Sequence, residues 1–205
     1  MRSPDDFCVY PALIHSSCHT LSDFIMEISL NANAVAFIGL CREFCIAVEN
    51  AREALRSEFI NEMIRLLPRI YITANDLPDN LLPDDGNYYD SALDPDYGEA
   101  LRRNIETLMG ADDVYLDVQE EDMKYSDTPV AESVSEGLVN IFAPFYTFVQ
   151  AIPDATELTV RQALYELKEL FSTYLSDVIL NVLRALNRVR MGADDFADDP
   201  DGGIY

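Results

Sequence analysis

The 205 residues carry 14 Lys and Arg against 37 Asp and Glu, a formal charge of −23 at pH 7, and 49% of them are apolar. This length corresponds to one domain, and this apolar content excludes global disorder. The negative charge repels phosphate and anionic lipid, so we expect no nucleic-acid partner and no membrane-surface partner. No uncharged apolar stretch approaches the roughly 20 residues of a transmembrane helix.

The two ends of the chain differ from its middle. Residues 1–25 lack helical periodicity and a signal-peptide core, so we expect a loosely ordered arm and a cytoplasmic protein whose four Cys are reduced. Met26 precedes the first periodic segment and is an alternative translation start. Residues 192–205 combine five Asp with Gly and Pro, which predicts a disordered acidic tail. The predicted domain therefore spans residues 26–191.

Between these ends, apolar residues recur at helical spacing. The first segment spans residues 34–48, and the second spans residues 50–76 with Pro68 inside it. Asp94 and Pro95 provide an N-cap and a first helical residue for a third helix, which ends at Gly110.

Two more helices follow. Ser133 and Glu136 form a capping box that opens the fourth helix, and the fifth runs from Thr156 or Thr159 to about Arg190. Residues 114–118 have strand character but no evident partner, so we interpret them as an extended loop. The sequence therefore predicts an all-α fold, a helical bundle of about five helices with two long acidic loops at residues 77–93 and 111–128.

The acidic residues are concentrated in these loops. Residues 76–99 hold eight acidic residues and no basic residue, and residues 112–136 hold nine against one Lys. Crowded carboxylates favour a bound cation or a basic partner. Four interpretations stay open: a solubilising surface, a docking face for a basic protein, a divalent-metal site, and a mimic of nucleic-acid charge. The carboxylates considered for a metal are Asp112, Asp113, Asp117, Asp122 and Asp127.

Groups suited to catalysis are few. Both His residues lie in the N-terminal arm, so a Ser or Cys nucleophile would lack a base in the predicted core. A Gly-rich phosphate loop is also missing from the sequence. A zinc site that combines Cys41 and Cys45 with ligands in the arm is disfavoured, because these residues lie on unrelated segments. We therefore expect no cofactor and favour binding over catalysis.

A polar stripe follows the predicted fifth helix. Its members recur at intervals of three or four residues and share a face; they are Tyr174, Asp177, Asn181, Arg184 and Arg188. Arg184 lies among apolar neighbours and needs a carboxylate partner, for which the acidic loop offers Asp122 or Asp127. The pair is either a clamp that holds the loop on the bundle or the floor of an anion- or peptide-binding pocket. The predicted binding site comprises Asp122, Lys124, Tyr125, Asp127, Tyr174, Asn181 and Arg184.

Several stretches resemble a bacterial family, the domain of unknown function DUF5063. They are residues 112–116 (DDVYL), 121–129 (EDMKYSDTP), 66–71 (LLPRIY) and 181–186 (NVLRAL). The resemblance covers about residues 30–190 and implies a helical domain without an established activity. The chain departs from the family pattern at Leu175 and Ser176, where Trp-Gly is usual, and at Asn187, where His is frequent. A catalytic His at that place is therefore disfavoured.

Together these observations predict an acidic helical domain that acts as a protein-interaction module, with a basic protein as its partner. The predicted site is the loop 112–128 against Tyr174, Asn181 and Arg184. The alternative is a divalent-metal-dependent hydrolase that uses the same carboxylates.

Overall fold

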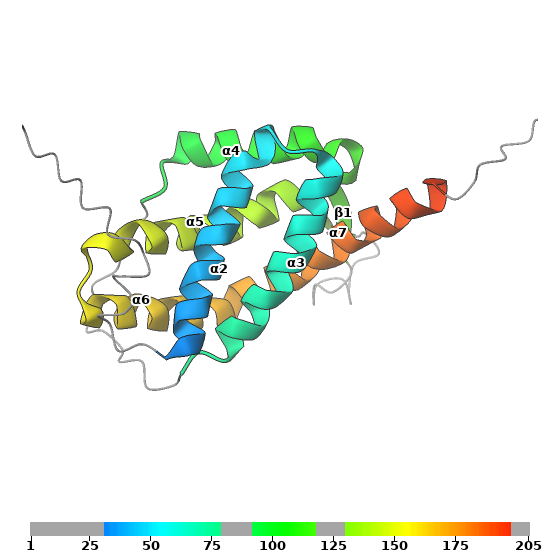
Figure 1. Ribbon diagram of the computed structural model, residues 1–205. Coiled ribbons are helices and arrows are strands. Elements are labelled where there is room, and N and C mark those ends of the chain that lie inside the picture. Colours follow the sequence, from blue (N-terminus) through cyan, green and yellow to red (C-terminus); the bar gives the residue numbers. More distant parts are fainter. Residues whose placement is uncertain (1–30, 79–91, 118–129, 198–205) are drawn as a thin grey trace, which may run out of the picture.

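The computed structural model describes residues 31–78, 92–117 and 130–197. Within them, five long helical segments surround one apolar core, which confirms the predicted all-α bundle (Figure 1). The segments are α2 (Ala32–Glu49), α3 (Arg56–Asn75), α4 (Pro95–Met109), α5 (Val134–Ala151), and α6 (Glu157–Leu170), which a π-helical turn (Phe171–Leu175) joins to α7 (Ser176–Ala197).

Four helices begin at a side chain that accepts a hydrogen bond from the first turn. In each case the side-chain oxygen satisfies a backbone N–H that has no partner within the helix. The predicted starts at Asp94, Ser133 and Thr156 are confirmed by these bonds. The N-cap residues are Asn31 for α2, Asp94 for α4, Ser133 for α5 and Thr156 for α6.

The predicted second helix begins too early. Residues Asn50–Arg52 form a 3-10 turn, and α3 starts only at Arg56, after Leu55 in extended conformation. The helices α2 and α3 lie side by side, so the chain must reverse direction between them (Figure 1). Apolar spacing continues across this reversal and therefore does not reveal it.

The interpretation of residues 114–118 as a loop was wrong. Strand β1 (Val114–Asp117) pairs antiparallel with β2 (Val130–Ser133), with Val114 opposite Ser133 and Leu116 opposite Ala131. The partner strand β2 directly precedes α5. The capping box at Ser133 indicates the start of α5 but gives no sign of the strand before it. Ladder hydrogen bonds between the two strands stabilise both.

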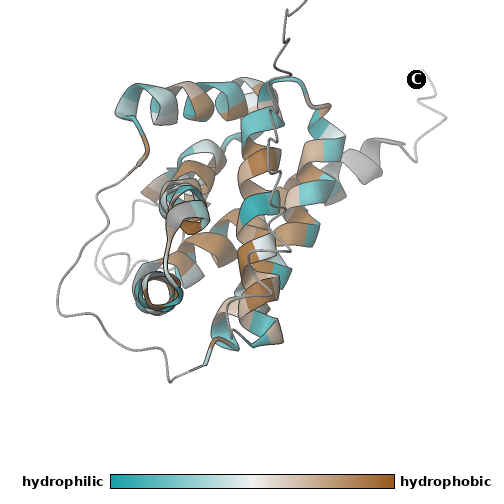
Figure 2. Cartoon of the chain, turned by 60° about the vertical axis from the view of Figure 1, so that its left-hand side comes forward, coloured by the Kyte–Doolittle hydropathy of each residue, from teal (hydrophilic) through white to brown (hydrophobic). Residues whose placement is uncertain are grey.

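Aromatic side chains and one glycine define the centre of the bundle. The buried ring of Phe145 makes edge contacts with Phe37 and Phe44, at centroid distances of 5.9 and 5.8 Å. A Cβ at Gly137 would lie 2.5 Å from Cγ2 of Val182, so α5 and α7 approach closely at this point. Figure 2 shows apolar residues on the faces that the helices turn toward one another.

Two further observations concern the ends and the hydropathy of the helices. Helix α7 continues to Ala197, beyond the boundary predicted at residue 191, while residues 198–205 lie outside the described part of the chain. None of the helices in the described ranges has the length and apolar character that crossing a membrane requires.

Candidate functional site

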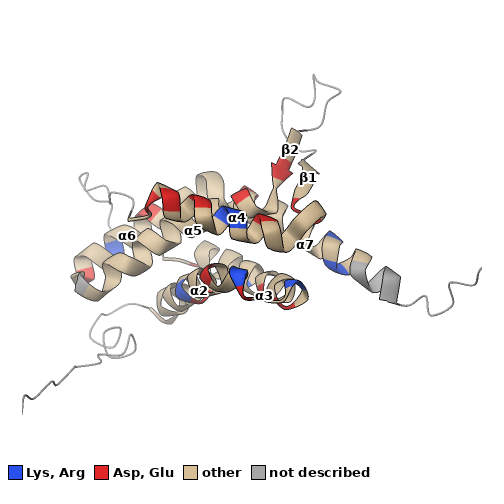
Figure 3. Ribbon diagram, turned by 90° about the horizontal axis from the view of Figure 1, so that it is seen from above, with Lys and Arg blue, Asp and Glu red and all other residues tan. Residues whose placement is uncertain are grey.

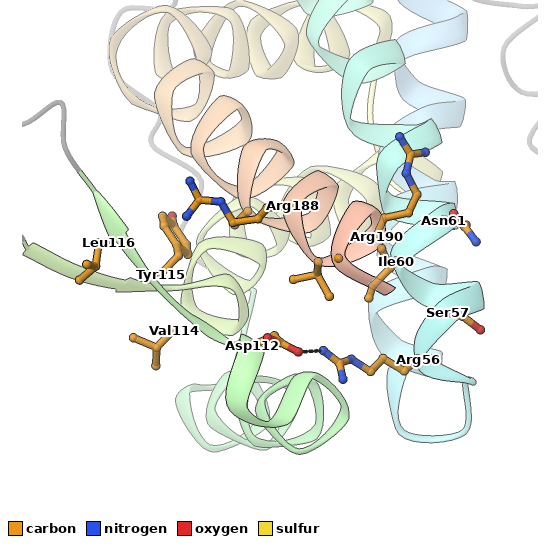
Figure 4. Close-up of a pocket in the computed structure, with 13 residues that line it drawn as sticks. Arg56, Ser57, Ile60, Asn61, Asp112, Val114, Tyr115, Leu116, Arg188 and Arg190 are labelled. Carbon is orange, nitrogen blue, oxygen red and sulfur yellow. Dashed lines mark hydrogen bonds and ion pairs between the residues drawn. The ribbon is translucent and has the colours of Figure 1, made fainter. Parts of the chain in front are cut away.

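Three segments that are distant in the sequence meet at one end of the bundle. The first turns of α3, the strand β1 and the last turns of α7 enclose a cleft of about 760 Å³ (Figure 4). We call it the arginine cleft. Its lining includes Arg56, Ile60, Asn61, Asp112, Val114, Tyr115, Leu116, Ala185, Arg188, Val189 and Arg190.

The cleft is cationic although the chain is strongly acidic. Three arginines line it, Arg56, Arg188 and Arg190, against one acidic residue, Asp112. The guanidinium of Arg190 points away from the hairpin (Figure 4), and Arg190 also lines a neighbouring hollow that contains Glu58 and Glu62. Arg56 and Asp112 form an ion pair, which Figure 4 shows at the base of the cleft. After this pair is counted, the guanidinium of Arg188 remains on the hairpin side of the cleft, in a chain whose formal charge is −23.

Several guanidinium donors in the cleft are available to a ligand. Arg188 is exposed, and no carboxylate of the described residues lies within ion-pair distance of it. Nη2 of Arg190 donates to Oδ1 of Asn187 at 2.7 Å, which leaves the other N–H groups of the Arg190 guanidinium for a ligand. Nε of Arg56 also has no acceptor among the described residues, but this atom is buried and a ligand in the cleft does not reach it.

The wall on the side of β1 is apolar. Val114 and Leu116 are 61% and 54% exposed, and Tyr115 is half-buried against the core. Figure 4 shows the guanidinium of Arg188 extending toward the hairpin on the side of Tyr115. The cleft therefore combines cationic donors with apolar surface, the combination that suits an amphipathic anionic ligand.

A buried carboxylate fixes the position of this wall. Asp113 is 3% exposed, and its two oxygens accept from the backbone N–H of Ser135 at 2.8 Å and from Oγ of Ser135 at 2.7 Å. The backbone N–H of Val134 donates to the carbonyl oxygen of Asp113 at 2.8 Å. These bonds attach the base of the hairpin to the first turn of α5.

Two of the carboxylates considered for a metal are bound by protein donors. Asp112 pairs with Arg56, and Asp113 holds Ser135. The side chain of Asp117 lies outside the described residues, as do Asp122 and Asp127. Within the described ranges, no group of three His, Cys, Asp or Glu side chains gathers in a way that could hold a metal ion.

The predicted binding residues are distributed over several places. Tyr174 is exposed on the π-helical turn, and Asn181 and Arg184 are partly buried in α7. None of these three lines the arginine cleft, to which α7 contributes Ala185 and Arg188 instead. The clamp between Arg184 and the acidic loop stays a prediction. The remaining four, Asp122, Lys124, Tyr125 and Asp127, lie outside the described residues.

The sequence contains one signal for this cleft. Three of the 14 basic residues, Arg184, Arg188 and Arg190, fall within seven positions of an otherwise acidic chain. Arg188 belongs to the predicted polar stripe, whereas Arg190 was not singled out. Arg56 could not be associated with them from the sequence, because most of the predicted domain separates it from Arg188.

Comparison with known proteins identifies the family. The sequence model described as Domain of unknown function (DUF5063) matches residues 28–192. The chain belongs to this family. The DUF5063 fold is also similar to the crystal structure of protein BF1032 from Bacteroides fragilis, with 21% identity, a TM-score of 0.67 and coverage of 85% of this chain and 98% of the other. That likeness concerns the fold alone. A search of curated proteins finds no match to this DUF5063 chain.

Proposed function

We propose that this DUF5063 chain is a binding module whose arginine cleft takes an anionic ligand. The observation that carries the proposal is the exposed guanidinium of Arg188, which extends toward the hairpin across the cleft and has no carboxylate partner among the described residues. Guanidinium donors form planar, two-pronged hydrogen bonds with carboxylates, and the nearby apolar wall strengthens such bonds by excluding water. The volume of the cleft is that of a typical ligand site.

Several basic residues outside the cleft are paired with carboxylates, unlike Arg188. On α4, Arg102 and Arg103 each hydrogen-bond Glu99 at 2.8 Å, and these bonds, that of Arg102 first, lower the pKa of Glu99 to about 2. On α6, Arg161 pairs with Glu157. Figure 3 shows blue and red side by side on these helices.

The basic-partner and hydrolase hypotheses depend on the acidic residues of the loop 112–128, of which the structure describes residues 112–117. They stay predictions. Both hypotheses require a positively charged ligand, a basic protein or a metal ion, whereas the cleft proposal requires an anionic one. One binding experiment therefore separates the cleft proposal from the other two.

The test is thermal unfolding with citrate as a carboxylate probe and with oligolysine as a basic probe. We expect citrate at about ten times its dissociation constant to raise the melting temperature by about 3–6 °C. The variant Arg188→Glu should lose this rise. The matched control is Arg69→Glu, because Arg69 is an exposed residue of α3 outside the cleft, and it should keep the rise. Equal stabilisation of both variants, or stabilisation by oligolysine alone, would contradict the proposal.

A further inference from the structure

We propose that the anionic ligand of the arginine cleft is an extended acidic segment of a partner protein, which adds to β1 as a third strand. This inference rests on the proposed function and names its ligand. Strand addition to an open sheet edge is a general mode of peptide recognition, in which main-chain hydrogen bonds supply affinity and alternate side chains supply specificity.

The cleft contacts the edge of β1 rather than one of its faces. Val114, Tyr115 and Leu116 all line it. Successive side chains of a strand point to opposite faces, so a cavity that contacts three consecutive residues must lie along the edge between those faces. The other edge of β1 is occupied by β2, and among the described residues the sheet has these two strands.

The ladder register identifies the backbone groups on this open edge. Val134 donates its N–H to the carbonyl of Asp113, so Asp113 and Val134 are a hydrogen-bonded pair. Pairs of this kind alternate along an antiparallel ladder, so Tyr115 also bonds toward β2. The N–H and C=O groups of Val114 and Leu116 therefore point away from β2, and no group of the described residues bonds them there.

The faces of β1 predict the sequence of the added strand. A residue placed beside Tyr115 lies on the face toward which Arg188 extends (Figure 4), where a carboxylate fits. Glu132 shares this face but lies across β1, on the side of β2. Residues placed beside Val114 and Leu116 lie next to exposed apolar side chains, where aliphatic groups fit. The segment should therefore alternate acidic and aliphatic residues over about four to six positions, the length of an average strand.

A polypeptide fits these features better than a small anion does. A free carboxylate would bond the guanidinium groups but leave the apolar wall and the backbone groups of Val114 and Leu116 without partners. Figure 3 shows the hairpin standing away from the helices, so a chain of a partner could approach its edge. The hairpin cannot tilt freely, because Asp113 holds its base to α5.

The first experiment measures amide hydrogen exchange in the full chain. The probe is an acetylated, amidated hexapeptide in which Asp alternates with Val. We expect its binding to slow the exchange of the Val114 and Leu116 amides by about tenfold or more, as new hydrogen bonds protect them. The Tyr115 amide should change little, because it already bonds β2. Arg188→Glu should weaken binding by about tenfold or more, and Arg69→Glu by less than about twofold.

The second experiment removes one donor from the open edge. Leu116→Pro deletes the outward N–H, a position where an edge strand tolerates Pro, and should weaken peptide binding by about fivefold or more. Leu116→Val keeps the N–H and should bind like the wild type. Unchanged protection of the Tyr115 amide verifies that the hairpin of each variant is intact. A hexapeptide N-methylated at alternate residues repeats the test on the unaltered protein. It should bind the wild type at least as weakly as the unmethylated peptide binds Leu116→Pro.

The outcomes separate the two proposals. If the hexapeptide binds without protecting Val114 and Leu116, or if N-methylation does not weaken it, strand addition is wrong while anion binding by the cleft stands. If neither citrate nor the hexapeptide binds, both proposals fail. If the two amides are protected only as protein concentration rises and a dimer forms, the edge pairs with a second copy of the chain, and the acidic partner segment is wrong.

Discussion

Asp113 connects the cleft to the bundle through a single side chain. Its carboxylate is buried and accepts two hydrogen bonds from Ser135, one of them from a backbone N–H in the first turn of α5. The partial positive charge of a helix N-terminus stabilises an anion at this position. The side chain therefore serves both as a cap for α5 and as an anchor for β1.

Removal of this anchor should destabilise the fold. We expect Asp113→Ala to lower the free energy of unfolding by about 2–3 kcal/mol, because two donors of Ser135 lose a charged acceptor in a buried place. The neighbouring Asp112→Ala removes an exposed ion pair and should cost less than about 1 kcal/mol. Urea denaturation of both variants checks the difference, and equal losses would contradict the role of Asp113.

The two cysteines of α2 illustrate how burial controls chemistry. Burial raises the pKa of Cys41 well above its usual value, with a smaller contribution from Cys45. Burial, and then the charge of Glu49, raises the pKa of Cys45 to about 12. Because the thiolate is the reactive form, both side chains should be inert in the folded protein.

A pH series tests this expectation. The folded state holds these protons more tightly than the unfolded state, so the stabilisation is complete below the ordinary thiol pKa of 9.0 and is lost as the pH rises toward about 12. We expect the free energy of unfolding to fall across that range, and to fall less in Cys45→Ala. Mass spectrometry after treatment with iodoacetamide at about pH 8 should find Cys41 and Cys45 unmodified until denaturant is added.

At the scale of elements, two glycines in helices have opposite roles. Gly137 allows α5 to contact Val182 of α7, whereas a Cβ at Gly39 of α2 would meet nothing within 4 Å. We expect Gly39→Ala to stabilise the fold by up to about 1 kcal/mol through helix propensity. Gly137→Ala should destabilise it by about 1–2 kcal/mol, because the stiff side chain of Val182 cannot move aside cheaply. Thermal melts of the two variants should shift in opposite directions, and a stabilised Gly137→Ala would refute the close contact.

The elements also show what could be predicted from the sequence. Apolar spacing and capping residues identified the helices, because both signals are local, as at Asp94 and Ser133. The strand pair was missed, because its pairing joins two short segments and neither is marked by composition. The arginine cleft was missed for the same reason: Arg56 and Arg188 line one cleft only after α3 and α7 have packed against each other.

The π-helical turn is a second element that spacing could not reveal. It lies between α6 and α7, and the segment on both sides keeps helical periodicity. A turn of this kind inserts an extra residue into a helix and rotates the faces that follow it. Tyr174 lies within the turn, so the predicted stripe of Tyr174, Asn181 and Arg184 does not continue along one regular helix.

At the scale of the whole molecule, the formal charge of −23 should make stability depend on salt. Like charges repel across the folded surface, and ions screen that repulsion. We expect the melting temperature to rise by a few degrees between about 10 and about 150 mM NaCl. A fall would mean that surface ion pairs such as those of Glu99 outweigh the repulsion.

The same melts test the metal hypothesis. At matched ionic strength, we expect MgCl₂ and NaCl to give the same melting temperature, because screening depends on ionic strength while site binding depends on the ion. An additional rise with Mg²⁺ that Asp122→Asn abolishes would support the hydrolase alternative instead. The variant Asp113→Asn provides no such test, because it alters the anchor of the hairpin.

The register of the hairpin has one more consequence. Asp117 lies directly opposite Val130, so the chain leaves and re-enters the fold at adjacent positions. The entropy of closing such a connection grows slowly, by about 0.6 kcal/mol for each doubling of its length. A change in the length of this connection should therefore cost the fold little free energy, provided that the pairing of Asp117 with Val130 is kept.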